Sequence, residues 1–207
     1  MAQLDLPQQY LPELVALSQG NRTRARGAAR TFAGNKFMTE TSSTAVLSVP
    51  SAGDTAPGAR AEAFAFAIGI RCNDDEITAI EYLEPCPEVA PKTPLAKEAV
   101  RQLRAWLKDP RFAFGLPLAA AGTHFQRRVW EQISAIPAGR TMSYGEVAAA
   151  IRSGPRAVGN ACGANPYPIV VPCHRVVAAN HGLGGFARQR GGFLLDVKKW
   201  LLQHERG

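Results

Sequence analysis

The chain has 207 residues, 46% of them hydrophobic, which is enough to build a packed core in one large domain or two small ones. No apolar run approaches the about 20 residues that cross a bilayer, and the first twenty residues carry Asp5, Glu13 and two prolines where a signal peptide has a basic start and an apolar block, so we expect a cytoplasmic globular protein. The formal net charge of +7 favours a polyanionic partner, although a basic balance also occurs in proteins that never touch nucleic acid.

Residues 1–60 mix Ala, Ser, Thr, Gly and Arg without a sustained period, which predicts a flexible basic tail of low complexity. Its first 37 residues carry basic side chains against only Asp5 and Glu13. These basic residues are Arg22, Arg24, Arg26, Arg30 and Lys36. A weak hold on phosphates and a solvated extension without a role both fit this composition, and the second is the simpler interpretation.

Residues 61–118 predict a small α/β domain. The runs FAFAIGIRC and ITAIEYLEPC are rich in β-branched and aromatic residues and are separated by the turn 73–75, so they predict a hairpin. Thr93 and Pro94 then offer an N-cap and a first-turn proline for a helix. The residues expected on its apolar face are Leu95, Ala99, Val100, Leu103 and Leu107.

Residues 119–207 predict a mainly helical domain. Thr123 and Ser143 are each followed three residues later by Gln or Glu, which is the pattern of a capping box at the start of a helix. The run RAVGNACGAN predicts a further short helix, and with the helix after Ser143 it suggests a helix-turn-helix. The chain ends in FLLDVKKWLLQHE, an amphipathic helix whose last acidic residue is Glu205.

The run VVPCHRVV, residues 170–177, puts a thiol, an imidazole and a guanidinium between apolar pairs that predict a buried strand. A thiol is nucleophilic as its thiolate, and an imidazole backed by a carboxylate is the usual means of forming one. For an isolated pair such as Cys173 and His174, however, a buried thiol beside a satisfied histidine is the more common arrangement. The four cysteines show no metal-binding spacing, so we expect free thiols and no metal.

Several sequence runs that occur in a fixed order favour a catalytic role for Cys173 and His174 over a structural one. IPAGRTMSYGEVA, RAVGNACGANP, PIVVPCHRVV, GLGGF and KKWLLQHE together resemble the O6-alkylguanine-DNA alkyltransferases, or methylated-DNA–protein-cysteine methyltransferases. The resemblance is dense from Gly122 to Glu205, limited to the order of elements over 61–118, and absent from 1–60. It implies a ribonuclease H-like N-terminal α/β domain, followed by a winged-helix-like DNA-binding domain with a helix-turn-helix.

The resemblance also implies roles for residues of the catalytic group. Cys173 corresponds to the alkyl acceptor, His174 to a base that acts through water, and Glu205 to the carboxylate that orients this histidine. Asn165 corresponds to the residue that joins the recognition helix to the active-site loop. Tyr144 corresponds to the tyrosine that helps rotate the target nucleotide out of the duplex and donates a proton to the departing guanine.

Further residues are implied for DNA and for the substrate pocket. Arg156 corresponds to the arginine that fills the gap left in the duplex, and Tyr144, Gly145 and Ala157 are expected to contact the DNA with it. The expected pocket residues are Cys162, Val176 and Phe186. Many family members have tyrosine where this chain has Phe186, which keeps an aromatic wall but removes a hydroxyl.

The function implied is DNA repair by stoichiometric transfer of an alkyl group from O6-alkylguanine, with O4-alkylthymine as a further candidate, to Cys173. The thioether formed cannot be hydrolysed by nearby groups, so each molecule repairs one base, without cofactor or metal. We expect a monomer, associated with the nucleoid while bound to DNA and with no membrane partner. Two rivals are a non-enzymatic alkyltransferase-like protein, which lacks the cysteine, and a Cys-His hydrolase, which needs an oxyanion hole that no pattern here indicates.

Overall fold

The structure is a computed structural model that describes residues 45–49, 64–179, 182–189 and 191–207. All of them belong to one of the two compact units of the chain, the unit from Met38 to Gly207. Within these described ranges, no helix combines the length and the apolarity needed to cross a membrane.

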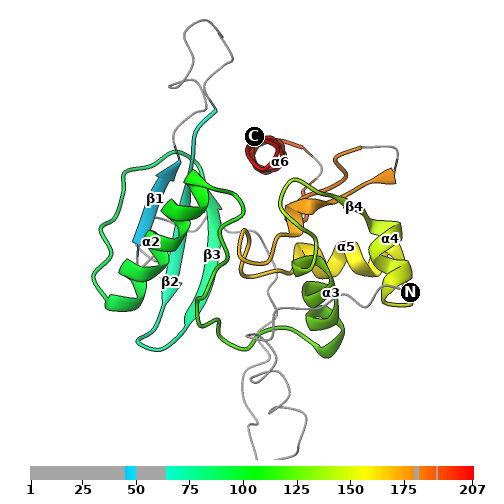
Figure 1. Cartoon of the computed structure of the whole chain (residues 1–207), viewed down its shortest axis with the longest axis horizontal. Coiled ribbons are helices and arrows are strands. Elements are labelled where there is room, and N and C mark those ends of the chain that lie inside the picture. Colours follow the sequence, from blue (N-terminus) through cyan, green and yellow to red (C-terminus); the bar gives the residue numbers. More distant parts are fainter. Residues whose placement is uncertain (1–44, 50–63, 180–181, 190) are drawn as a thin grey trace, which may run out of the picture. The chain divides into compact units, whose positions relative to one another are not determined.

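The N-terminal part contains an antiparallel sheet in the order β1-β2-β3, formed by Ala45–Val49, Phe66–Cys72 and Ile77–Leu83 (Figure 1). The predicted hairpin is confirmed, because β2 and β3 are neighbours in this sheet. The Asn73 side-chain oxygen accepts two backbone N–H groups of the turn, at 2.9 and 2.7 Å, which fixes the tight connection between these strands.

The strand β1 corrects the assignment of all of residues 1–60 to a tail. Ala45–Val49 pairs with β2 over its whole length, with Val49 opposite Phe66. Most of the strand is buried, so it belongs to the core of the sheet. Its run AVLSV is short and lies among Ser and Thr, and its partner is distant in the sequence, so no local turn signal reveals the pairing. The rest of the predicted tail lies outside the described residues.

Helix α2, Pro94–Lys108, packs against the sheet (Figure 1). Its predicted start is confirmed, since the Thr93 side chain accepts the N–H of Ala96 at 3.2 Å and Pro94 stands in the first turn. Of the predicted apolar face, Ala99, Val100 and Leu103 are buried, whereas Leu95 and Leu107 are partly exposed. Trp106 completes the buried face and is 1% exposed.

The C-terminal part is mainly helical, as predicted. Its helices are α3 (His124–Ser134), α4 (Tyr144–Ala150), α5 (Pro155–Gly163) and α6 (Phe193–His204), and its short parallel strands are β4 (Met142–Ser143) and β5 (Val176–Val177). Both capping boxes are confirmed, at Thr123 and at Ser143. Each such cap contributes about 1 kcal/mol to helix stability.

One hydrophobic cluster joins the two parts. It contains residues of the sheet, of α2 and of the C-terminal helices. Phe66 of β2 meets Trp200 of α6 edge-on, with ring centroids 5.1 Å apart. The N–H of Ile80 in β3 donates to the carbonyl of Pro166 at 2.8 Å, so the sheet also supports the loop that leads to Cys173.

Candidate active site

The segment before Cys173 is a turn, and the strand predicted there is not formed. Cys173–Arg175 is one turn of 3-10 helix, and the strand β5 begins only after it. Ile169, which is 2% exposed, has a φ of 75°, a conformation that is strained for a β-branched residue. Such strain is held only where the surroundings fix the chain, and here it turns the backbone toward Cys173.

Asn165 is one of the groups that fix this turn. Its side-chain amide donates to the carbonyl of Val171 at 2.8 Å, and its side-chain oxygen accepts the N–H of Tyr167 at 3.0 Å. Asn165 therefore links the end of α5 to the residues just before Cys173. The family resemblance implies a link of this kind at Asn165.

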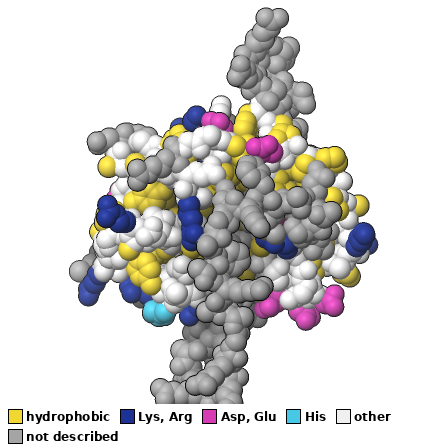
Figure 2. Space-filling view, turned by 180° about the vertical axis from the view of Figure 1, so that it is seen from behind, with side chains coloured by type: hydrophobic (Ala, Val, Ile, Leu, Met, Phe, Trp, Pro, Cys, Tyr) yellow, Lys and Arg dark blue, Asp and Glu magenta, His cyan; other side chains and the backbone are white. Residues whose placement is uncertain are grey.

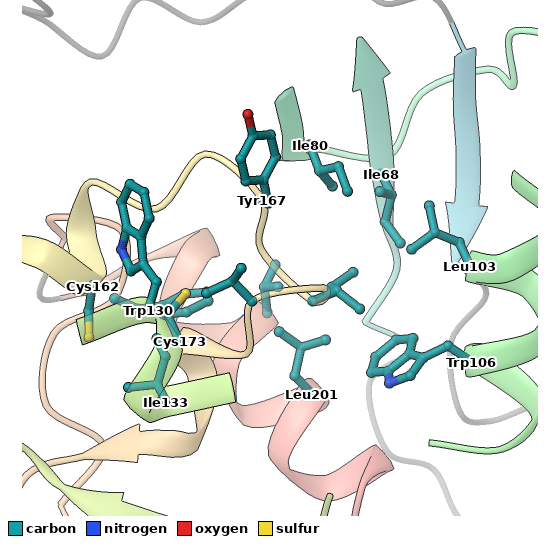
Figure 3. Packing of buried hydrophobic residues seen from close by; sticks show 14 of the residues in the cluster. Ile68, Ile80, Leu103, Trp106, Trp130, Ile133, Cys162, Tyr167, Cys173 and Leu201 are labelled. Atoms are coloured by element: carbon teal, nitrogen blue, oxygen red, sulfur yellow. The ribbon is translucent and has the colours of Figure 1, made fainter. Parts of the chain in front are cut away.

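Cys173 lies in the hydrophobic cluster with only 6% of its surface exposed (Figure 3). Burial raises the pKa of the Cys173 thiol above its ordinary value, although a hydrogen bond from the Asn165 side chain and the positive charge of Lys198 act in the opposite direction. The resting group is therefore a neutral thiol, and Asn165 and Lys198 are placed to stabilise its thiolate form.

His174 and Glu205 form a buried pair next to this thiol. His174 Nε2 lies 2.9 Å from Glu205 Oε1, and His174 is fully buried. Burial lowers the pKa of His174, although Glu205 opposes the shift, so the imidazole rests neutral. A neutral imidazole that donates from Nε2 to a carboxylate has Nδ1 free to accept a proton.

Arg175 holds the carboxylate of Glu205 in place. Its guanidinium donates to both carboxylate oxygens, with Nε 2.9 Å from Oε2 and Nη2 2.7 Å from Oε1. Burial alone would raise the pKa of Glu205, but the hydrogen bonds from His174 and Arg175 lower it to about 2. The carboxylate therefore stays charged and can stabilise an imidazolium at His174.

Lys198 is a site residue that the sequence analysis missed. It is fully buried in α6, and its ammonium donates to the carbonyls of Val176, Leu183 and Gly185, at 2.7, 2.6 and 3.3 Å. Burial lowers its pKa to about 8, while nearby Cys173 and Cys162 oppose the shift. At neutral pH it therefore supplies a positive charge close to the reactive sulfur.

Tyr144 and Phe186 are aromatic residues around this ammonium. Lys198 Nζ lies 5.8 Å from the Tyr144 ring centroid and 5.6 Å from that of Phe186. The Tyr144 hydroxyl donates to the carbonyl of Gly185 at 2.9 Å, and burial raises its pKa, so it remains protonated. Gly184 must be glycine, because its φ is +66° and a Cβ there would lie 2.9 Å from the Tyr144 ring.

The other predicted pocket residues, Cys162 and Val176, are buried with Cys173 in the same cluster, and so is Phe186. Burial, with a smaller contribution from the nearby Cys173, raises the pKa of Cys162 to about 12, so this second thiol is neutral. The predicted DNA-contacting residues lie near the starts of α4 and α5, where Gly145 and Arg156 are exposed and Ala157 is partly exposed. Within the described part of the chain, no cluster of His, Cys, Asp and Glu is suited to hold a metal ion.

Residues 124–207 match the family model for the DNA-binding domain of 6-O-methylguanine DNA methyltransferase. The chain is 43% identical over 117 residues to the constitutive methylated-DNA–protein-cysteine methyltransferase of Bacillus subtilis, an alignment that covers 56% of this chain and 68% of the relative. It is 53% identical over 92 residues to the methylated-DNA–protein-cysteine methyltransferase of Salmonella typhimurium, covering 44% of this chain and 51% of that protein.

The fold is also similar to solved structures of methyltransferases of this kind. The chain is similar to Mycobacterium tuberculosis OGT in complex with DNA, with a TM-score of 0.57 and 36% identity over 68% of this chain and 86% of that one. An O6-methylguanine DNA methyltransferase from Methanococcus jannaschii gives a TM-score of 0.51 and 28% identity, covering 68% of this chain and 89% of that one. The similarity to these structures extends beyond the DNA-binding domain that the family model matches.

Proposed function

Because the chain belongs to the methylated-DNA–protein-cysteine methyltransferase family, it is a DNA-repair methyltransferase that acts by direct reversal of damage, and we propose that Cys173 is the residue that accepts the alkyl group. The observation that carries this proposal is the buried pair of His174 and Glu205 directly beside Cys173, with 2.9 Å between the imidazole and the carboxylate. The proposed substrate is O6-alkylguanine in duplex DNA.

In the proposed reaction the sulfur of Cys173 attacks the alkyl carbon on guanine O6. The thiol proton passes to His174, a carbon–sulfur bond forms, the carbon–oxygen bond breaks, and the departing guanine receives a proton, from Tyr144 in our proposal. The proton held by the His174 imidazolium then returns to the Tyr144 oxygen through solvent, so both residues end neutral. Glu205 stabilises the imidazolium, and Lys198 stabilises the thiolate before it attacks. The thioether product is stable, so the cysteine is consumed.

We propose that α4 and α5 act as the helix-turn-helix of a winged-helix-like DNA-binding domain, which follows a ribonuclease H-like N-terminal domain in the chain. Support comes from the exposed surface at the starts of these helices, which carries Gly145 and Arg156. In Figure 2, Lys and Arg side chains stand at several separate places on the visible face. We assign specific DNA contact to the exposed starts of α4 and α5, and a monomer is sufficient for it.

The hydrolase alternative has less support. A Cys-His hydrolase needs backbone donors aimed at an oxyanion beside the nucleophile. Here the N–H groups of Cys173 and Arg175 donate instead to the carbonyls of Val171 and Pro172, at 2.8 and 3.0 Å. Non-enzymatic alkyltransferase-like proteins lack the acceptor cysteine, whereas this chain has Cys173 at that position, so this alternative also has less support.

The proposed function is tested by the stoichiometry of repair. When O6-methylguanine duplex is titrated against a fixed amount of protein, we expect the amount of base repaired to equal the amount of protein and then to stop. Added fresh protein should restart repair, because each molecule carries one reactive sulfur. If more moles of base were repaired than moles of protein were present, the cysteine would not be consumed, and a hydrolase that turns over would be the better interpretation.

Arg156 gives a prediction that separates the handling of DNA from the chemistry. It is exposed near the start of α5, and none of the ion pairs between described residues involves it. If its side chain fills the stack left by the flipped nucleotide, Arg156→Ala should slow repair of duplex by roughly 10- to 100-fold, since unstacking costs a few kcal/mol. The reaction with free O6-benzylguanine, which involves no flipping, should be nearly unchanged.

Single-turnover rates at saturating protein measure both reactions without interference from affinity. An equal fall on duplex and on the free base would show that Arg156 acts on the chemistry instead. No fall on duplex at saturating protein would show that it contributes only to affinity, as a phosphate contact would.

A further inference from the structure

A two-residue turn lies between the wall of the proposed pocket and the protein surface. It starts at Phe186, which is buried and whose ring centroid lies 5.6 Å from Lys198 Nζ. Phe186 and Gln189 exchange two backbone hydrogen bonds, each of 2.8 Å. The two residues between them, Ala187 and Arg188, form the tip of the turn and are exposed. The turn therefore connects the buried pocket wall to a charged side chain at the surface.

The backbone is strained at both tip residues. The φ of Ala187 is 46° and that of Arg188 is 68°. Two-residue turns with positive φ at both central residues favour Asn and Gly, because a larger side chain crowds the backbone there. Such strain is concentrated at functional sites, where the surroundings hold the chain in place. It therefore indicates a role for the side chains at this tip, and only Arg188 carries a group that can recognise a ligand.

Arg188 also packs against the end of α5. Gly163 is the last residue of this helix, and a Cβ there would lie 3.0 Å from Arg188 Cγ and 3.9 Å from its Nε. The stem of the arginine therefore crosses the helix one residue after Cys162, a residue of the proposed pocket. Among the described residues, the guanidinium of Arg188 has no hydrogen bond and no ion pair.

Arg156 and Arg188 lie at opposite ends of α5. Arg156 is the second residue of the helix and Gly163 the last, so the contact with Arg188 is about 10 Å further along the axis, at about 1.5 Å per residue. The start of α5 is the end that we assign to the duplex. The other end lies beside the pocket, because Cys162 and Phe186 are both buried there with Cys173.

A nucleotide that enters the pocket with its base leaves its phosphates outside. The base can be covered by apolar and aromatic walls, whereas a buried phosphate without a partner would be costly, so the phosphodiester stays at the entrance. A guanidinium matches a phosphate in charge and can donate two parallel hydrogen bonds to it. An exposed arginine beside the pocket, without a partner among the described residues, is complementary to such a phosphate.

We propose that Arg188 binds a backbone phosphate next to the flipped nucleotide and so holds the extruded strand at the entrance of the pocket. This inference rests on the proposed function and adds to it a DNA contact beyond the starts of α4 and α5. Arg188 makes and breaks no covalent bond. Its contribution is to affinity, and a free base, which has no phosphate, should not depend on it.

The salt dependence of binding tests the phosphate contact. Arg188→Gly removes the charge and suits the positive φ, so its melting temperature should equal or exceed that of the native protein. In the Cys173→Ser background we expect it to bind O6-methylguanine duplex about eightfold more weakly at 0.1 M salt, since one phosphate contact contributes about 0.9 to the slope of log Kd against log salt. Arg188→Lys keeps the charge and should keep most of the slope. An unchanged slope for Arg188→Gly would overturn the proposal.

Neutral methylphosphonates identify the phosphate. Duplexes are made with a single methylphosphonate at each position within about two nucleotides of the lesion, on the lesion strand, because the arginine is proposed to contact the flipped nucleotide's own backbone. At one position we expect about an eightfold loss of affinity when Arg188 is present and less than a twofold loss in Arg188→Gly. Losses of equal size in both proteins at every position would overturn the proposal.

Arg101→Ala is the matched control, because it removes the same charge from an exposed position on α2, far along the chain from the site. It should change neither the slope nor the response to methylphosphonates, and an effect equal to that of Arg188→Gly would show a long-range effect of net charge instead. A matching fall in the reaction of Arg188→Gly with free O6-benzylguanine would place the arginine on the base, which also overturns the proposal.

The two proposals can fail separately. Methyl transfer by the native protein without coupling between Arg188 and any phosphate would overturn the role of Arg188 alone. Coupling without methyl transfer from O6-methylguanine duplex would overturn the proposed function alone.

Discussion

We expect the Cys173→Ser protein to bind duplex that carries O6-methylguanine and to take up no methyl group from it. Serine keeps the size of the side chain, but its hydroxyl forms almost no anion at neutral pH. Burial makes the anion still less accessible, because it disfavours any charge at this position. The loss of transfer should therefore be complete on the time scale of the native reaction, while the residues of α4 and α5 that we propose to contact DNA are unchanged.

Gel-shift titration and the release of label from methylated duplex measure binding and transfer separately. Cys86→Ser is the matched control, since Cys86 lies in the loop after β3 and outside the described site, and it should transfer at the native rate. Residual transfer by Cys173→Ser at more than a trace of the native rate would mean that another residue accepts the alkyl group.

The second large effect is expected at His174. Its replacement by alanine removes the proposed acceptor of the thiol proton, and general-base assistance contributes about 100-fold or more. DNA affinity should be nearly unchanged, because His174 is fully buried. Glu205→Gln should also slow transfer, but it leaves the Arg175 guanidinium without its carboxylate, so a loss of stability is expected as well.

The pH dependence distinguishes transfer of the thiol proton to His174 from loss of that proton to solvent. In the native protein the thiol proton stays within the site, so the rate should be nearly flat from above the pKa of His174, which burial lowers, up to about pH 8, where Lys198 begins to lose the charge that stabilises the thiolate. The two proteins are therefore compared below this pH. Without His174 the proton must leave to solvent, so the rate of His174→Ala should rise about tenfold per pH unit up to the thiol pKa. Parallel profiles for the two proteins would exclude His174 as the proton acceptor.

Local signals predicted the helices well. The capping boxes at Thr123 and Ser143 and the proline after Thr93 depend on residues within one turn, so the sequence contains the whole determinant of each start. The strand β1 depends instead on pairing with β2, which lies outside any local window. The turn before Cys173 was predicted as a strand because its β-branched residues favour extended backbone, whereas Asn165 and the support from β3 impose the turn.

The site could be predicted only in part. Cys173 and His174 are adjacent in the sequence, but Glu205 is distant, and only the family resemblance connected it to them. Lys198 had a signal that was overlooked, because it stands three residues before Leu201 on the buried face of α6.

The mass of the protein after reaction shows whether the alkyl group moves from guanine to the sulfur of Cys173. The native protein is incubated with duplex carrying labelled O6-methylguanine, and the intact protein and its peptides are weighed. We predict a gain of one methyl group per protein molecule, located on the peptide that contains Cys173, together with restored guanine in the DNA. Loss of the lesion with an unchanged protein mass, or a methyl group on any other residue, would show that Cys173 is not the alkyl acceptor.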